Sequence, residues 1–228
     1  MKYLIFLLML LITQNCLAQT NVQIEVYNKY KETTNPFLYN GIAYPAYIPG
    51  SIFEARHACF RDSICKPGTL VYMGRTYNDV ALKYDIVIDE VAILHHVLQS
   101  EVVLRKSEVT EFSIGNTDFI NIPKGQNIPP GYYELYQKGK TRILCKHRKT
   151  YMTGVNYNHR FYTMINEDDR KFYIEKNNQF HLVKNEKSLY EIFPDRKNEL
   201  KDFIRRNELF IKETPGSSIP IVVEFINK

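Results

Sequence analysis

The chain has 228 residues, with 30 lysines and arginines against 25 aspartates and glutamates, so its formal net charge is +5. This mild excess is well below that of a nucleic-acid-binding domain and excludes nucleic acid as an expected partner. The length suffices for one large or two small domains, and 17 tyrosines with 13 phenylalanines favour strands over helices.

The N-terminus predicts a secretory signal peptide over residues 1–18. Lys2 supplies a positive charge, residues 3–12 form an apolar run, and Cys16-Leu17-Ala18 provides small residues before a cut that makes Gln19 the first mature residue. About ten apolar residues are too few to span a membrane, which takes about 20. We therefore expect an exported protein, located in the periplasm, at the outer-membrane periphery or outside the cell, with no transmembrane segment after cleavage.

Lipid attachment at Cys16 is the alternative interpretation of this leader. The residues before Cys16, Thr13-Gln14-Asn15, include two polar amides where a lipoprotein signal needs small apolar residues. Cleavage and release are therefore favoured.

Three cysteines remain in the mature chain. In an oxidising compartment Cys59 and Cys65 are candidates for a disulfide that closes a short loop, with Cys145 left as a small buried thiol next to Ile143 in an apolar register. His57, Cys59 and Cys65 are also ligand types for zinc, but their spacing matches no established zinc motif. We expect no metal and no cofactor.

The first part of the mature chain predicts a β meander, in which each strand pairs with the next. The hairpin around Gly115-Asn116 is well supported, because both residues tolerate positive φ. The expected strands are residues 22–27, 69–73, 76–77, 80–84, 87–94, 109–114 and 118–122.

The second part adds further strands and then helices. Ser188 and Glu191 suggest a capping box at one helix start, Asp195 is a candidate cap for a second helix, and the tail 217–227 favours a third helix. The expected strands are residues 132–137, 141–148, 161–165, 171–175 and 179–183. Residues 123–131, rich in Pro and Gly, suggest a boundary between the two parts.

These patterns predict an α+β fold, mainly an antiparallel β meander in two halves with C-terminal helices packed on the sheet. The halves are residues 19–125 and 126–228, either as separate units or as one continuous domain.

Four segments resemble a family of uncharacterised exported proteins of Bacteroidetes-type bacteria. They are YNGIAYPAY from Tyr39, GTLVYMGRTYNDVALKYD from Gly68, PGYYELYQKGKTRILCKHRKT from Pro130 and SLYEIFPDRKNELKDFIRRN from Ser188. The resemblance implies export and carries no assigned activity. Segment 57–65 differs from that family, because it has two cysteines where the family usually has aromatic and acidic residues.

Common enzyme motifs are absent from the sequence, which contains no HExxH, GxSxG, GxGxxG or P-loop pattern. A glycosidase needs only two carboxylates brought together in space, and Asp85, Asp89 and Glu90 are candidates, although acids in turns are usually solvated. His95 and His96 are neighbours that would point to opposite faces of a strand, so they suit a shared metal poorly.

A basic run precedes residue 150 and is the best candidate for a binding surface. On a strand its even positions would form one cationic face, with Ile143 and Cys145 pointing inward. The proposed anionic-ligand surface consists of Lys138, Lys140, Arg142, Lys146 and Arg148. The simpler interpretation, which the pattern favours, is a solvated face that also protects a sheet edge.

The sequence thus predicts an exported, non-catalytic protein that acts by binding or as a cell-envelope component, with an envelope protein or an anionic glycan as partner. A secreted hydrolase acting on envelope or polysaccharide material is the alternative.

Overall fold

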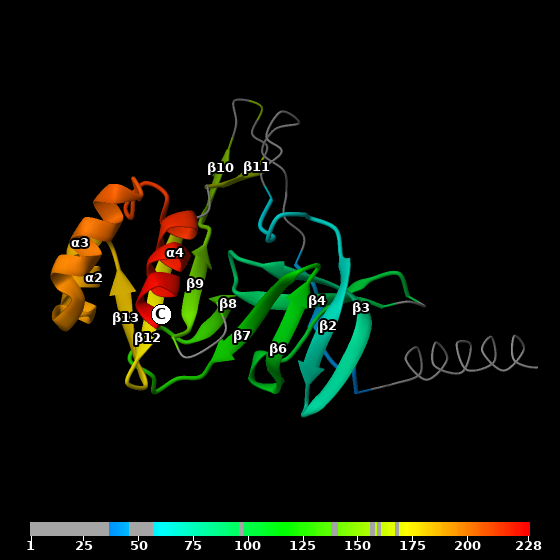
Figure 1. The fold of residues 1–228 in the computed structure, drawn as a ribbon. Coiled ribbons are helices and arrows are strands. Elements are labelled where there is room, and N and C mark those ends of the chain that lie inside the picture. The colour runs from blue at the N-terminus through cyan, green and yellow to red at the C-terminus, as the bar shows by residue number, and fades with distance from the viewer. Residues whose placement is uncertain are drawn as a thin grey trace, which may run out of the picture.

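One large antiparallel sheet dominates the computed structural model, which describes residues 37–45, 57–95, 98–137, 141–155, 158, 161–166 and 169–228 (Figure 1). The sheet has 11 strands in the order β1-β5-β4-β3-β2-β6-β7-β8-β9-β12-β13. With helices following at the C-terminal end, the protein has an α+β fold. The leader 1–18 and the expected strand 22–27 lie outside the described residues.

Most strands pair with their neighbours in sequence. The strands are β1 (Ile42–Ala43), β2 (Lys66–Tyr72), β3 (Arg75–Asp85), β4 (Glu90–Leu94), β5 (Glu101–Val103), β6 (Val109–Ile114), β7 (Thr117–Ile122), β8 (Gly131–Gln137), β9 (Ile143–Arg148), β12 (Asp169–Lys176) and β13 (Gln179–Val183). The chain leaves this order after β5, where the 3₁₀ turn Lys106–Glu108 leads to β6 on the far side of β2.

A separate hairpin is inserted between β9 and β12. Its strands β10 (Tyr151–Val155) and β11 (Phe161–Ile165) pair with each other and stand away from the main sheet (Figure 1). The hairpin is an insertion in the main sheet, because β9 and β12, the strands before and after it, pair directly with each other. The sheet also continues across residues 123–130, since β7 pairs with β8. The division into two halves stays a prediction.

The turns explain where the expected strands were right and where they were wrong. The hairpin at Gly115 forms as expected between β6 and β7, with Gly115 at φ +57°. The expected strand 87–94 is wrong in its first part, because residues 86–89 form a turn and β4 begins only at Glu90. Asp89, at φ +57°, is in the left-handed region that ends strand geometry.

Within the described residues, three α-helices lie at the β9–β12–β13 end of the sheet (Figure 1). They are α2 (Glu186–Ile192), α3 (Lys197–Arg206) and α4 (Pro215–Asn227), so the expected helix in the tail is confirmed. The expected caps are wrong. Asn185 caps α2 and forms the capping box with Ser188, because α2 begins earlier than expected, and α3 follows the 3₁₀ turn Pro194–Arg196 with no side-chain cap. No described helix combines the length and hydropathy that a membrane span requires.

Strand β9 is covered on both faces, which determines where its side chains can act. Ile143 and Cys145 pack on one face with Phe172 and the C-terminal helices. Leu144 packs on the opposite face with Tyr133 and Tyr173. Successive residues of β9 therefore face two different environments.

Candidate anion-binding pocket

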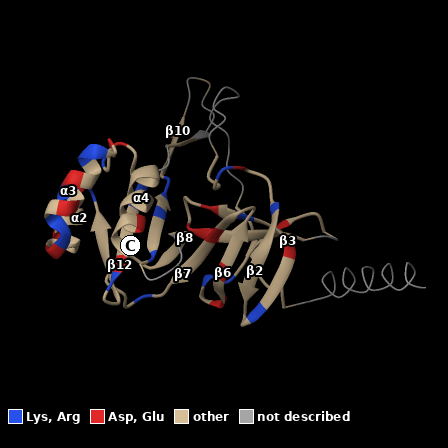
Figure 2. Cartoon of the chain, in the orientation of Figure 1, with Lys and Arg blue, Asp and Glu red and all other residues tan. Residues whose placement is uncertain are grey.

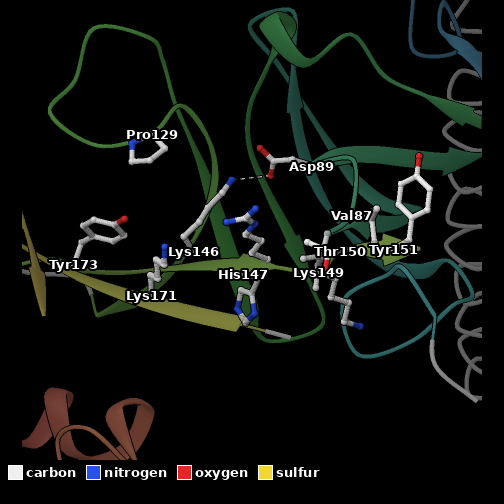
Figure 3. Close-up of a pocket in the computed structure, with 12 residues that line it drawn as sticks. Val87, Asp89, Pro129, Lys146, His147, Lys149, Thr150, Tyr151, Lys171 and Tyr173 are labelled. Carbon is white, nitrogen blue, oxygen red and sulfur yellow. Dashed lines mark hydrogen bonds and ion pairs between the residues drawn. The ribbon is translucent and has the colours of Figure 1, made fainter. Parts of the chain in front are cut away.

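The basic strand β9 borders a cavity of about 520 Å³ on its Leu144 face. Figure 3 shows the side chains around it, which come from the 86–89 turn, the segment before β8, β9 with the residues after it, and β12. The lining residues used below are Val87, Asp89, Pro129, Lys146, Arg148, Lys149, Tyr151, Lys171 and Tyr173.

A buried carboxylate shapes the turn that forms one wall. Asp85 is fully buried. It accepts hydrogen bonds from the Val87 and Ile88 backbone N–H groups at 2.9 and 3.2 Å and from the Tyr44 hydroxyl at 2.6 Å. Several hydrogen bonds to a carboxylate offset the free-energy cost of removing its charge from water. Asp85 is thus a structural acid, and the expectation that it is solvated was wrong.

Asp89 extends from the end of this turn into a network of donors. Its Oδ1 accepts from Lys146 Nζ at 2.8 Å and from the Tyr84 hydroxyl at 2.6 Å. Its Oδ2 accepts from Lys106 Nζ at 2.7 Å. The carboxylate is therefore held by two ammonium groups and one phenol.

Lys146 is largely buried, with 16% of its side chain exposed. Besides Asp89, its ammonium donates to the Tyr132 carbonyl at 3.0 Å. Burial lowers the pKa of Lys146, Asp89 acts in the opposite direction, and the neighbouring Lys106 lowers it further. Figure 3 shows this side chain extending from β9 to Asp89.

The ion pair lies directly against the backbone at Gly131. A Cβ at this position would come within 2.0 Å of Asp89 Oδ2 and 2.7 Å of Lys146 Nζ. Gly131 also has φ +126°, which L-residues avoid. Glycine is required here by both contact and conformation.

Further cations surround the same cavity. The β9–β12 register places Lys171 directly opposite Lys146. Lys171 is exposed and forms no ion pair within the described part of the chain. Lys149 donates to the carbonyls of His57 and Cys59 at 2.9 and 3.0 Å, which fixes the segment 57–59 against β9. Like charges on paired strands repel, so the pocket carries an excess positive field.

The remaining wall is apolar and aromatic. Figure 3 shows Pro129 and Tyr173 on the same side of the cavity, with Val87 and Tyr151 on the other. The Tyr173 ring packs edge-on against Tyr133, with 5.7 Å between the ring centroids. This packing fixes one aromatic ring beside the cations.

The structure divides the basic surface predicted from the sequence. Lys146 and Arg148 line the pocket. Arg142 lies before β9, forms a bidentate pair with Glu175 and lines a different hollow of about 840 Å³. Lys138 and Lys140 lie outside the described residues. His95 is described and lies directly after β4, whereas His96 lies outside the described residues.

The expected Cys59–Cys65 disulfide is not formed in the structure, in which Cys59, Cys65 and Cys145 are free thiols. Each thiol of the expected pair has another partner, because Cys59 Sγ lies 3.6 Å from the Tyr44 hydroxyl and Cys65 Sγ donates to Glu101 Oε1 at 3.7 Å. Burial is the main cause that raises the pKa of Cys65 to about 12.

Sequence reasoning missed the partners of the basic strand. Lys106, Gly131 and Tyr173 come from three distant segments and join Lys146 only through strand pairing and the 86–89 turn. The glycine after two prolines was visible in the sequence, but nothing local linked it to a carboxylate.

Charge is distributed differently elsewhere on the molecule. Figure 2 shows basic and acidic residues mixed along α2 and α3. Such a mixture produces no field of one sign, unlike the pocket beside β9.

No protein-family model, curated protein or solved structure matches the chain. The resemblance to exported bacterial proteins therefore stays a prediction, and the pocket is interpreted from its own geometry.

Proposed function

We propose that this is an exported binding protein whose pocket beside β9 holds a small acidic ligand, with a carboxylated or phosphorylated sugar as the preferred class. Its volume of about 520 Å³ is in the range of small-molecule sites, which extends from about 300 to 1,000 Å³. Export rests on the signal peptide predicted over residues 1–18.

The observation that carries the proposal is the juxtaposition of Lys146 and Lys171 across paired strands. Asp89 is the only acid among the described lining residues, and two lysines already hold it. Lys171 is exposed and forms no ion pair within the described residues, so its charge is not balanced by Asp89. An anionic group placed there would relieve this repulsion.

The aromatic wall favours a ligand with a ring as well as a charge. Tyr173 and Pro129 offer flat apolar surface beside the cations. Sugar rings stack on such surfaces through their C–H faces, while their acidic substituent pairs with lysine or arginine.

Binding is favoured over hydrolysis because the described lining of the pocket holds no pair of carboxylates suited to catalysis. A glycosidase needs two, about 5 to 9.5 Å apart, to act as acid and as base or nucleophile. The described lining offers Asp89 alone, and its oxygens already accept from two lysines and a tyrosine.

Isothermal titration calorimetry with galacturonate, glucose 6-phosphate and glucose tests the proposal. We expect the two acids to bind and glucose not to bind. Lys171→Glu should weaken binding at least tenfold, whereas Lys201→Glu, an exposed charge reversal on α3, should leave it unchanged. Equal affinity in wild type and Lys171→Glu would overturn the proposed site. New reducing ends from an acidic polysaccharide would favour the hydrolase instead.

A further inference from the structure

A second cluster of polar side chains lies on the opposite face of β9. Cys145 and His147 are two positions apart in β9, so their side chains lie on the same face of the strand. The register places Glu134 of β8 directly across from Cys145. One donor atom from each residue lies within 4.8 Å of the others. Thiolate, imidazole and carboxylate are the three ligand types that zinc uses in proteins.

The cluster is almost completely shielded from solvent. The exposed fractions are 0% for Cys145, 4% for His147 and 8% for Glu134. The His147 ring lies edge-on to Phe60, with 5.0 Å between centroids, and 6.4 Å from the ring centroid of Phe119. His147 Nε2 and Glu134 Oε2 are 2.6 Å apart, so imidazole and carboxylate already form a hydrogen bond.

A gain in folding stability does not explain why a carboxylate, a thiol and an imidazole are buried together here. A buried ion pair or polar network is often no more stabilising than apolar residues of the same volume. Neighbouring positions on this face are apolar, with Ile143 preceding the cluster on β9 and Phe172 across from Cys145 on β12. Three different metal-ligating groups converging in such a core therefore suggest a ligand of their own.

We propose that Glu134, Cys145 and His147 bind one divalent transition-metal ion, with Zn²⁺ as the best match to this mixed S, N and O donor set. The charges support this choice. One thiolate and one carboxylate neutralise a divalent cation, and histidine binds as the neutral imidazole, so the assembly adds no net charge to a region of low dielectric constant. Binding releases the thiol proton of Cys145 to solvent.

The geometry needs only local adjustment. Ligand atoms 2.0 to 2.3 Å from a tetrahedral metal are roughly 3.5 Å apart, so the contact between Glu134 and His147 must widen by about 1 Å. A rotation of the Glu134 side chain can provide this. Three protein ligands leave a fourth position for water, as in many zinc enzymes. Because the site is buried, we expect it to load most readily while the chain folds.

Cobalt is a suitable probe because it reports its own ligands. The purified chain is unfolded with a chelator and refolded with Co²⁺ or without metal. We expect one equivalent of cobalt, a thiolate-to-cobalt absorption band, the visible spectrum of tetrahedral Co²⁺ and loss of both on addition of Zn²⁺. Absence of the thiolate band from wild-type protein that has refolded, as judged by circular dichroism, overturns the proposal.

Variants show whether these three residues hold the metal. We expect each of three variants to lower the metal affinity by more than roughly 100-fold: Cys145→Ser, His147→Gln and Glu134→Gln. Loss of a residue that only hydrogen-bonds to a metal ligand already lowers metal affinity about 10- to 100-fold. Cys59→Ser removes another buried thiol and should leave the spectrum unchanged. Zinc that remains bound to folded Cys145→Ser after equilibrium dialysis also overturns the proposal. If a variant does not fold, Cys145→Ala gives the same comparison.

Discussion

Asp89 and Lys146 are separated by 57 positions in the sequence and form an ion pair of 2.8 Å between the 86–89 turn and strand β9. Lys106 binds the other carboxylate oxygen at 2.7 Å. The acid is thus fixed by lysines from two elements, and the turn that carries it becomes a wall of the pocket.

Removing this acid should destabilise the fold. Asp89→Ala leaves Lys146, which is largely buried, without its carboxylate, and we expect a loss of about 2 to 4 kcal/mol in the free energy of unfolding. Guanidinium denaturation measures it. Asp202→Ala removes an exposed ion pair with Arg205 on α3 and should cost less than about 1 kcal/mol. Equal losses in the two variants would contradict the buried role of Asp89.

Gly131→Ala should be more harmful than an ordinary glycine substitution. The added Cβ would overlap Asp89 Oδ2 at 2.0 Å, so the ion pair must move. Gly125→Ala is the matched control, because Gly125 also has positive φ, at +104°, but no atom lies within 4 Å of the Cβ position. We expect Gly125→Ala to cost about 1 to 2 kcal/mol from backbone strain and Gly131→Ala at least about 2 kcal/mol more. Thermal and guanidinium unfolding of both variants give the comparison, and similar losses would argue against the contact.

Glu90 should make stability depend on pH. Burial raises the pKa of its carboxyl above the usual value, and the nearby Lys106 offsets this only in part. The folded state therefore holds the Glu90 proton more tightly than the unfolded chain does. Because of Glu90, the free energy of unfolding falls as the pH rises from the ordinary glutamate pKa to the raised pKa of the folded state.

Glu90→Gln should abolish this contribution. We expect a higher melting temperature than wild type at pH 7.5 and a smaller difference near pH 4, measured by calorimetry. Glu191→Gln on α2 is exposed and serves as control. A wild-type advantage at pH 7.5 would contradict the assignment.

Cys65 should react slowly with alkylating reagents. Its pKa of about 12, against an ordinary 9.0, implies a thiolate fraction on the order of 1,000-fold lower near pH 8. Iodoacetamide labelling of the native protein, followed by peptide mass spectrometry, measures the rate.

The same labelling distinguishes a thiol from a disulfide. After denaturation without reductant, both Cys59 and Cys65 should be labelled, in agreement with the free thiols of the structure. Labelling at Cys145 alone among these three would show that the disulfide predicted from the sequence forms after all.

Local signals in the sequence predicted local structure well. The strands 161–165 and 179–183 and the hairpin at Gly115 have the expected positions, because turn residues and short segments of aromatic and apolar residues define them without help from distant segments. The turn at 86–89 was missed because Val87 and Ile88 have the composition of a strand, whereas the structure turns them by hydrogen bonds to Asp85.

The candidate sites were predicted only in part. The sequence placed Lys146 and Arg148 on one face of a strand, and both line the pocket. It did not reveal Asp89 as the partner of Lys146, nor Glu134 beside His147, because these contacts depend on which strands pair and in which register. Cys145 was expected to be a buried thiol and is one, but its polar neighbours were not foreseen.

The alternation along β9 also limits how this gene segment can change in evolution. Lys146 faces the pocket, while Cys145 packs with the C-terminal helices and the His147 ring packs against Phe60 and Phe119. Inserting or deleting one residue upstream in the strand would exchange these faces, burying an ammonium group in the apolar core and exposing the thiol and imidazole. We therefore expect substitutions to be tolerated in β9 more readily than changes in its length.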